Sequence, residues 1–123
     1  MPHVVLRGSV GIDPFNHVFK PVVEEKKEWL IKIEEIYLER SGLQAIVPAV
    51  VVEEGHAQTF YIRLSMPQTG GRLSIRLDPL TDPIKTRGVK RSIALLAEVM
   101  LGGNQEFTIE RHNLQGYFSG DPV

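Results

Sequence analysis

Four side chains suited to binding an anion alternate with apolar residues in two neighbouring segments, 59–65 and 72–77. Alternation with this period predicts two strands that each bury one face. If the strands pair with Ser65 opposite Arg72, their outward side chains form one small patch. Arginine forks fit phosphates and carboxylates, and a tyrosine ring can stack, so a phosphate ligand or single-stranded nucleic acid could bind there. The members of this patch are Tyr61, Arg63, Arg72 and Arg76.

A second basic group lies where we expect the first turns of a helix. Positive charges at that position oppose the helix dipole, which prefers anions at this end. A bound anion would remove the conflict, because backbone N–H groups and basic side chains would converge on it. The spacing does not match the phosphate loop of nucleotide hydrolases. The group consists of Lys85, Arg87, Lys90 and Arg91.

Both basic groups also have a purely structural explanation. Outward arginines keep a sheet face in solvent and prevent it from pairing with strands of other molecules. Asp78 and Asp82 lie close in sequence to the second group and would neutralise it locally. The sequence leaves the functional and the structural explanation of each group open.

The chain lacks the residue patterns of common catalytic and metal centres. It has no cysteine, which excludes thiol nucleophiles, thiolate zinc sites and disulfides. None of its four histidines lies four residues from another, and His56 follows Glu53 and Glu54 in a turn. We therefore expect no metal, no cofactor and no enzymatic activity. An enzymatic alternative would place a site near Asp78, Asp82 and Arg87.

Length and composition predict one globular domain over residues 1–123, with a flexible tail at 113–123. The chain has 42% hydrophobic and 24% charged residues, close to average values for globular proteins, and its net charge is -1. There is no bulk positive charge for nucleic acid and no apolar run of about 18 residues for a membrane. The first residues do not resemble a secretory signal, so a cytoplasmic location is expected.

The first half of the chain predicts strands and one ambiguous segment. Residues 3–10 are expected to form a strand and 11–18 a loop. Segment 22–40 fits a strand with a bulge at Glu34 and Glu35 better than a helix, although periodicity alone does not exclude the helix. Segment 43–53 is apolar on both faces, which predicts a strand covered on both sides. Pro48 within it predicts a bulge or a change of partner strand.

The second half predicts one long helix. Asp82 is a suitable N-cap with Pro83 at the first helical position, and Gly102 and Gly103 would end the helix. A last strand is expected over 106–111. The apolar face of the helix would be formed by Val89, Ile93, Leu96 and Met100. The predicted fold class is α+β, a mostly antiparallel sheet of five to six strands with this helix on one face.

The charge is unevenly distributed along the chain. Residues 24–54 contain eight glutamates and four basic residues, a net charge of −4, whereas residues 63–91 contain seven basic residues and two aspartates, a net charge of +5. Such a chain could pair with a second copy about a two-fold axis, with the opposite charges setting the register and the apolar strand 43–53 providing the affinity. The preferred hypothesis is therefore a small interaction module that forms a homodimer. Binding of an anionic ligand or nucleic acid is the alternative.

Overall fold

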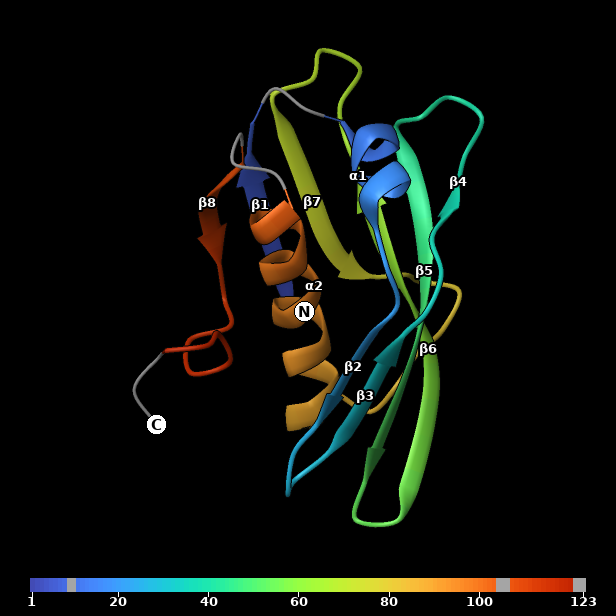
Figure 1. The fold of residues 1–123 in the computed structure, drawn as a ribbon, viewed down its shortest axis with the longest axis vertical. Coiled ribbons are helices and arrows are strands. Elements are labelled where there is room, and N and C mark those ends of the chain that lie inside the picture. The colour runs from blue at the N-terminus through green and yellow to red at the C-terminus, as the bar shows by residue number, and fades with distance from the viewer. Residues whose placement is uncertain (9–10, 104–106, 121–123) are drawn as a thin grey trace.

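The computed structural model describes residues 1–8, 11–103 and 107–120. It is an α+β fold in which an antiparallel sheet curls around the longer of two helices (Figure 1). The predicted fold class is confirmed, with eight strands in place of five to six. The elements are β1 (His3–Arg7), α1 (Ile12–Val18), β2 (Val22–Glu25), β3 (Leu30–Ile33), β4 (Tyr37–Leu38), β5 (Gln44–Glu53), β6 (His56–Ser65), β7 (Arg72–Leu77), α2 (Arg87–Gly103) and β8 (Thr108–His112).

The sheet has the order β2-β3-β5-β6-β7-β1-β8, and the short β4 also pairs with β5. Its inner face packs on α2 and carries the core. The predicted helix face is confirmed, because its four apolar residues are fully buried. The alternation predicted for β6 and β7 is confirmed as well, since the apolar positions of both strands point into the core. The part of the chain that the structure describes has no helix long and apolar enough to cross a membrane.

The segment 11–18, predicted as a loop, contains the helix α1 instead. Ile12 and Phe15 are three residues apart and are both buried under one side of it. Phe15 also makes an edge contact with Phe19, with ring centroids 5.7 Å apart. Glycine, aspartate and proline suit the first turn of a helix as well as a loop, so composition alone misassigned this segment.

The ambiguous segment 22–40 forms strands, as preferred over the helix, but three of them. β2 and β3 make a hairpin closed by a hydrogen bond from Lys26 N–H to the Trp29 carbonyl. Glu34 and Glu35 link β3 to β4 and do not form a bulge within one strand. The five consecutive charged residues at 24–28 are the sequence feature that indicates this turn.

Pro48 marks a change of partner on β5, as predicted. β3 pairs with residues 49–52 of β5, and β4 pairs with Ala45 and Ile46. Pro48 lies between these two ladders, so its missing N–H removes no hydrogen bond from either. The expectation that β5 is covered on both sides is wrong. Its second row of side chains is half-buried on the outer face, and both helices lie on the other face.

The long helix begins at Arg87, five residues after the predicted N-cap. The loop between β7 and α2, residues 78–86, covers the part of the β6 edge that β7 does not pair with. There the Tyr61 N–H donates to the Thr81 hydroxyl at 3.0 Å, and the Gln58 side chain bonds the backbone of Ile84 in both directions. A helical start at Asp82 would leave these edge groups without partners.

The β6–β7 register differs by two residues from the prediction. Ser65 lies opposite Ser74, and Arg63 lies opposite Arg76. A shift of two keeps every side chain on its predicted face. The last strand, predicted over 106–111, is β8 at 108–112. Phe107 precedes it and is buried, Ile109 is 38% exposed, and Glu106 lies outside the described residues.

The segment after β8 was expected to be a flexible tail. Its described residues run to 120, and Leu114 among them is buried. Tyr117 and Phe118 pack against the core. The flexibility of this segment stays a prediction.

Candidate functional site

The outer face of the sheet has an apolar half and a basic half. The apolar half is centred on the second row of β5, which we call the apolar row. The basic half lies on β7, β1 and β8, where arginines point outward. The apolar row consists of Ile46, Pro48, Val50 and Val52.

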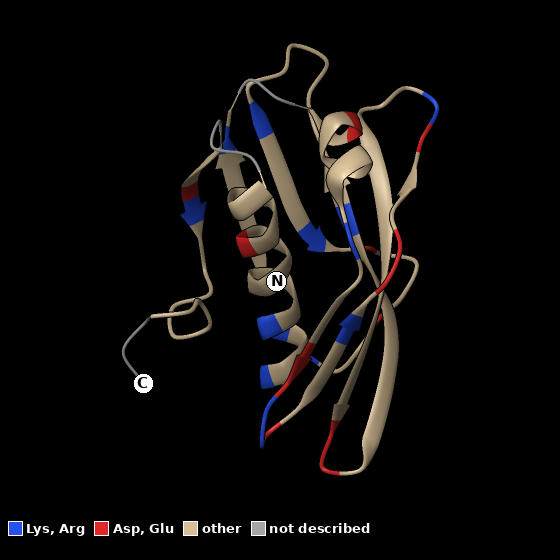
Figure 2. Ribbon diagram, in the orientation of Figure 1, with Lys and Arg blue, Asp and Glu red and all other residues tan. Residues whose placement is uncertain are grey.

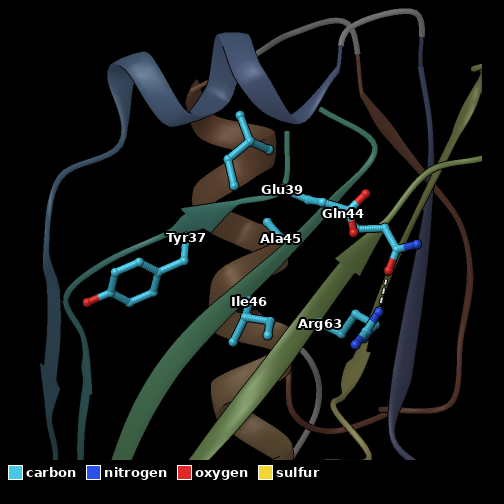
Figure 3. A pocket seen from close by; sticks show the side chains of 7 residues that line it. Tyr37, Glu39, Gln44, Ala45, Ile46 and Arg63 are labelled. Carbon is cyan, nitrogen blue, oxygen red and sulfur yellow. Dashed lines mark hydrogen bonds between the residues drawn. The ribbon is translucent and has the colours of Figure 1, made fainter. Parts of the chain in front are cut away.

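The apolar row is extended on both sides by further apolar side chains. Tyr37 lies opposite Ile46 and is 62% exposed, and Tyr61 lies opposite Pro48. Leu30 lies opposite Val52 on the β3 side. A pocket of about 220 Å³ opens beside the row between β4 and Arg63, and Figure 3 shows Tyr37 and Ile46 at its wall.

Arg63, a predicted member of the anion patch, has partners inside the chain. Its Nε donates to Asp78 at 2.8 Å, and one Nη donates to Gln44, as Figure 3 shows. Asp78 is fully buried, and its other oxygen accepts the Leu80 N–H at 2.8 Å. Arg63 thus serves to neutralise a buried carboxylate.

The other members of the predicted patch lie on the same outer face, but their neighbours differ. Arg72 is paired with Glu110 at 3.1 Å. Tyr61 is half-buried beside the apolar row. Arg76 is exposed, and its guanidinium has no hydrogen-bond or ion-pair partner within the described ranges. Of the three arginines in the predicted patch, Arg63 and Arg72 have carboxylate partners, and Arg76 has none among the described residues.

Arg91, predicted as a ligand-binding residue, is buried in an ion-pair network. It donates two hydrogen bonds to Glu24, at 2.9 and 2.8 Å, and one to Glu98. It also donates to the Tyr117 carbonyl at 2.7 Å and to the Ser119 hydroxyl at 3.3 Å. All five of its N–H groups are thereby used.

This network changes the acidity of Glu24 and Arg91. Hydrogen bonds from Arg91 lower the pKa of Glu24 below its ordinary value, although burial works against them. Burial alone would lower the pKa of Arg91, but its bonds to Glu24 and Glu98 raise it above the ordinary value. The Glu24–Arg91 ion pair therefore stays charged at neutral pH.

The remaining members of the second basic group lie on the surface of the helix start. The Arg87 guanidinium lies 5.9 Å from the ring centre of Trp29, and the Lys90 ammonium lies 5.8 Å from that of Tyr117. Lys85 faces Asp82 at 3.9 Å, with both side chains exposed. The members of this group thus have separate partners.

The anion expected at the start of α2 is supplied by the chain itself. Glu53, the last residue of β5, accepts the Gly88 N–H at 3.0 Å and the Thr86 hydroxyl. Its carboxylate occupies the place of an external anion. A ligand at this helix end is therefore not favoured.

The acidic and basic segments also meet within the chain. Glu24 from the acidic segment pairs with Arg91 from the basic one, and Figure 2 shows the acidic β2 beside the basic start of α2. Part of the uneven charge is thus paired within the chain. Asp78, Asp82 and Arg87 face Arg63, Lys85 and Trp29 respectively, so they do not share one site.

Sequence reasoning missed a pocket on the basic half of the outer face. It has a volume of about 240 Å³ and is lined by Met1, His3, Val5, Arg76 and Arg111. Arg111 lies opposite Val5 across the β1–β8 ladder. No local signal predicts this proximity, because residues 3, 76 and 111 meet only through the order of the strands.

Within the described ranges, no group of three or more histidines and carboxylates could hold a metal ion. Comparison of the chain with protein families, with curated proteins and with solved structures gave no match.

Proposed function

We propose that the chain is a non-enzymatic interaction module that pairs with a second copy of itself through the outer face of β5. The proposal rests on one observation, the apolar row. Its four apolar residues follow one another on a sheet face that neither helix covers. Burying apolar surface between two copies would favour their association by about 25 cal/mol for each Å² removed from water. Contiguous exposed apolar surface is typical of interaction sites.

The size of the face lies at the lower limit for a specific interface. β5 and β6 are ten residues long and form a strip of about 33 by 10 Å, to which the shorter β2, β3 and β4 add about 150 Å². Two copies would thus bury roughly 1,000 Å², about the smallest area expected of a specific complex.

The distribution of side chains suits a second copy as the partner. About a two-fold axis parallel to β5, β6 of one copy lies over β3 and β4 of the other. Arg63 then meets Tyr37 of the partner subunit, because both lie at the level of Ile46 on opposite sides of the row. An arginine over a tyrosine ring is a favourable pair. Lys32 meets Thr59 of the partner subunit, so no like charges meet.

The experiment is analytical ultracentrifugation at two salt concentrations. We expect a dimer whose stability changes little with salt, since the interface is apolar. Val50→Glu should give a folded monomer, because two carboxylates would lie near the symmetry axis. Leu80→Glu is the matched control on a 70% exposed loop residue and should remain a dimer.

A strict monomer at high micromolar concentration would overturn the proposal. So would a Val50→Glu variant that dimerises as well as the wild type. If Val50→Glu does not fold, Tyr37→Glu changes an exposed position on the same face and takes its place. A dimer unaffected by Tyr37→Glu and Val50→Glu lies elsewhere on the molecule.

A further inference from the structure

Two pairs of arginines lie on the basic half of the outer face. In one pair, a carboxylate lies between the two arginines. Arg7 and Arg72 are directly opposite each other on β1 and β7. One oxygen of Glu110 lies 3.2 Å from Nε of Arg7 and 3.1 Å from Nε of Arg72. Where these two arginines meet, the chain bridges them with an oxyanion of its own.

Arg76 and Arg111 form the second pair, and no carboxylate of the described residues bridges it. They lie on β7 and β8, on either side of β1, and are offset by two residues along it, because Arg76 lies opposite His3 and Arg111 opposite Val5. Their backbones are thus about 12 Å apart. Both side chains line the 240 Å³ pocket, in which Val5 is only 2% exposed. Neither guanidinium has a hydrogen-bond or ion-pair partner among residues 1–8, 11–103 and 107–120.

Arg76 is also surrounded by positive or neutral side chains. It lies opposite Arg63 on one side and opposite His3 on the other. Like charges that face each other across a ladder are destabilising. Asp78 neutralises Arg63, but no described carboxylate does the same for Arg76. An anion in the pocket would neutralise Arg76 in the same way.

The wall of the pocket is held by hydrogen bonds between distant parts of the chain. The Asn113 side chain accepts the His3 N–H at 2.9 Å and donates to the Met1 carbonyl at 2.7 Å. The His3 ring nitrogen lies 3.1 Å from the same carbonyl. These bonds fix the start of β1 against the end of β8, so a ligand need not order the pocket on binding.

We propose that a single phosphate group, free or as a monoester, binds between Arg76 and Arg111. A phosphate monoester carries a charge of about −1.5 to −2 at pH 7, which matches two guanidinium groups. Its terminal oxygens can accept bonds from both arginine forks. This site is independent of the proposed pairing, since it lies on β7, β1 and β8 and not on the apolar row.

A single phosphate fits this pocket better than a nucleic-acid strand. Single-stranded nucleic acid requires aromatic rings on which successive bases stack along a basic groove. The pocket is lined by no phenylalanine, tyrosine or tryptophan. Towards Arg7 and Arg72 the carboxylate of Glu110 interrupts the positive charge. The geometry therefore favours one compact anion.

The experiment is isothermal titration calorimetry of the full chain with inorganic phosphate and with glycerol phosphate at low salt. We expect saturable binding with one site per chain. Arg76→Gln and Arg111→Gln should each weaken binding about tenfold or more, as expected for a charged hydrogen bond. Arg72→Gln is the matched control, an arginine on the same face whose partner is Glu110. It should bind as the wild type does.

Three results would overturn the proposal. The first is no phosphate binding at low salt. The second is equal loss of binding in Arg72→Gln and Arg76→Gln, which indicates a diffuse charge effect. The third is binding of a single-stranded oligonucleotide that is much tighter than phosphate and falls steeply with salt. Circular dichroism of each variant shows whether a loss of binding reflects a loss of fold, and Arg76→Lys then tests the site in a protein that retains the charge.

Discussion

The carboxylate of Glu53 at the end of β5 accepts the backbone N–H of Gly88 in the first turn of α2, at 3.0 Å. The two residues are 35 positions apart in the chain. The first turn of α2 has no acidic residue of its own. The strand on which the helix packs thus also provides the negative charge that the helix end prefers.

Glu53→Ala should lower the free energy of unfolding by about 1–2 kcal/mol, the usual cost of losing a helix cap. The variant leaves the Gly88 N–H and the Thr86 hydroxyl without their partner. Urea denaturation measures the change. Glu34→Ala is the control, because Glu34 is exposed, and it should unfold as the wild type does. Equal stability of both variants would contradict the capping role.

Gly88→Ala should destabilise the protein by about 1–3 kcal/mol, although alanine is the better helix former. A Cβ at this position would lie 2.6 Å from Cγ1 of Val51 and 2.7 Å from Cδ of Glu53. The helix would have to move away from β5. Gly102→Ala is the matched control in the same helix, where a Cβ meets nothing within 4 Å. Thermal unfolding should show Gly102→Ala at least as stable as the wild type.

The Glu24–Arg91 pair predicts a loss of stability in acid. Arg91 lowers the pKa of Glu24 in the folded state below the ordinary value of 4.5, so the unfolded chain binds this proton more tightly. The stabilisation is therefore complete above the ordinary value and is lost as the pH falls through the lowered pKa. Glu24→Gln should cost about 2 kcal/mol at pH 7 and should weaken the pH dependence below about pH 5.

Denaturant unfolding at pH 7 and at pH 3 tests this prediction. The difference between wild type and Glu24→Gln should be smaller at pH 3 than at pH 7. Glu25→Gln changes the next residue of β2, which points outward, and serves as the control. A constant difference at both pH values would show that the charge of Glu24 is not what stabilises the fold.

Thr81→Val should lower the free energy of unfolding by about 1–2 kcal/mol, because it removes the acceptor of the Tyr61 N–H. The lost hydrogen bond lies at the edge of β6, beyond the residues that pair with β7. Hydrogen exchange at Tyr61 should accelerate in this variant. Thr69→Val, in an exposed loop, is the control with the same chemical change. Unchanged exchange at Tyr61 in Thr81→Val would disprove the role of the loop.

Periodicity predicted which side chains of β6, β7 and α2 point inward, because each of these elements buries one face. It also favoured strands over a helix for 22–40. Pro48 carried enough information to locate the change of partner on β5. These predictions depend on residues near in sequence, whose spacing directly reflects the period of the backbone.

Features that depend on distant residues could not be predicted in the same way. From the sequence alone, Arg91 could bind a ligand. In the structure its partner is Glu24, which lies 67 residues earlier in the chain. The pairing of Arg63 with Asp78 depends on where the loop after β7 turns. The start of α2 depends on the unpaired edge of β6, which only the length of β7 reveals.

The position of β1 has a consequence for how the protein is made. Both partners of this first strand, β7 and β8, come from residues 72 onward. A ribosome adds about 5–20 residues per second. For several seconds after its synthesis, β1 must therefore remain without a ladder, with Val4 and Leu6 open to water or to chaperones. The sheet can close only after residues 72–77 and 108–112 have also emerged.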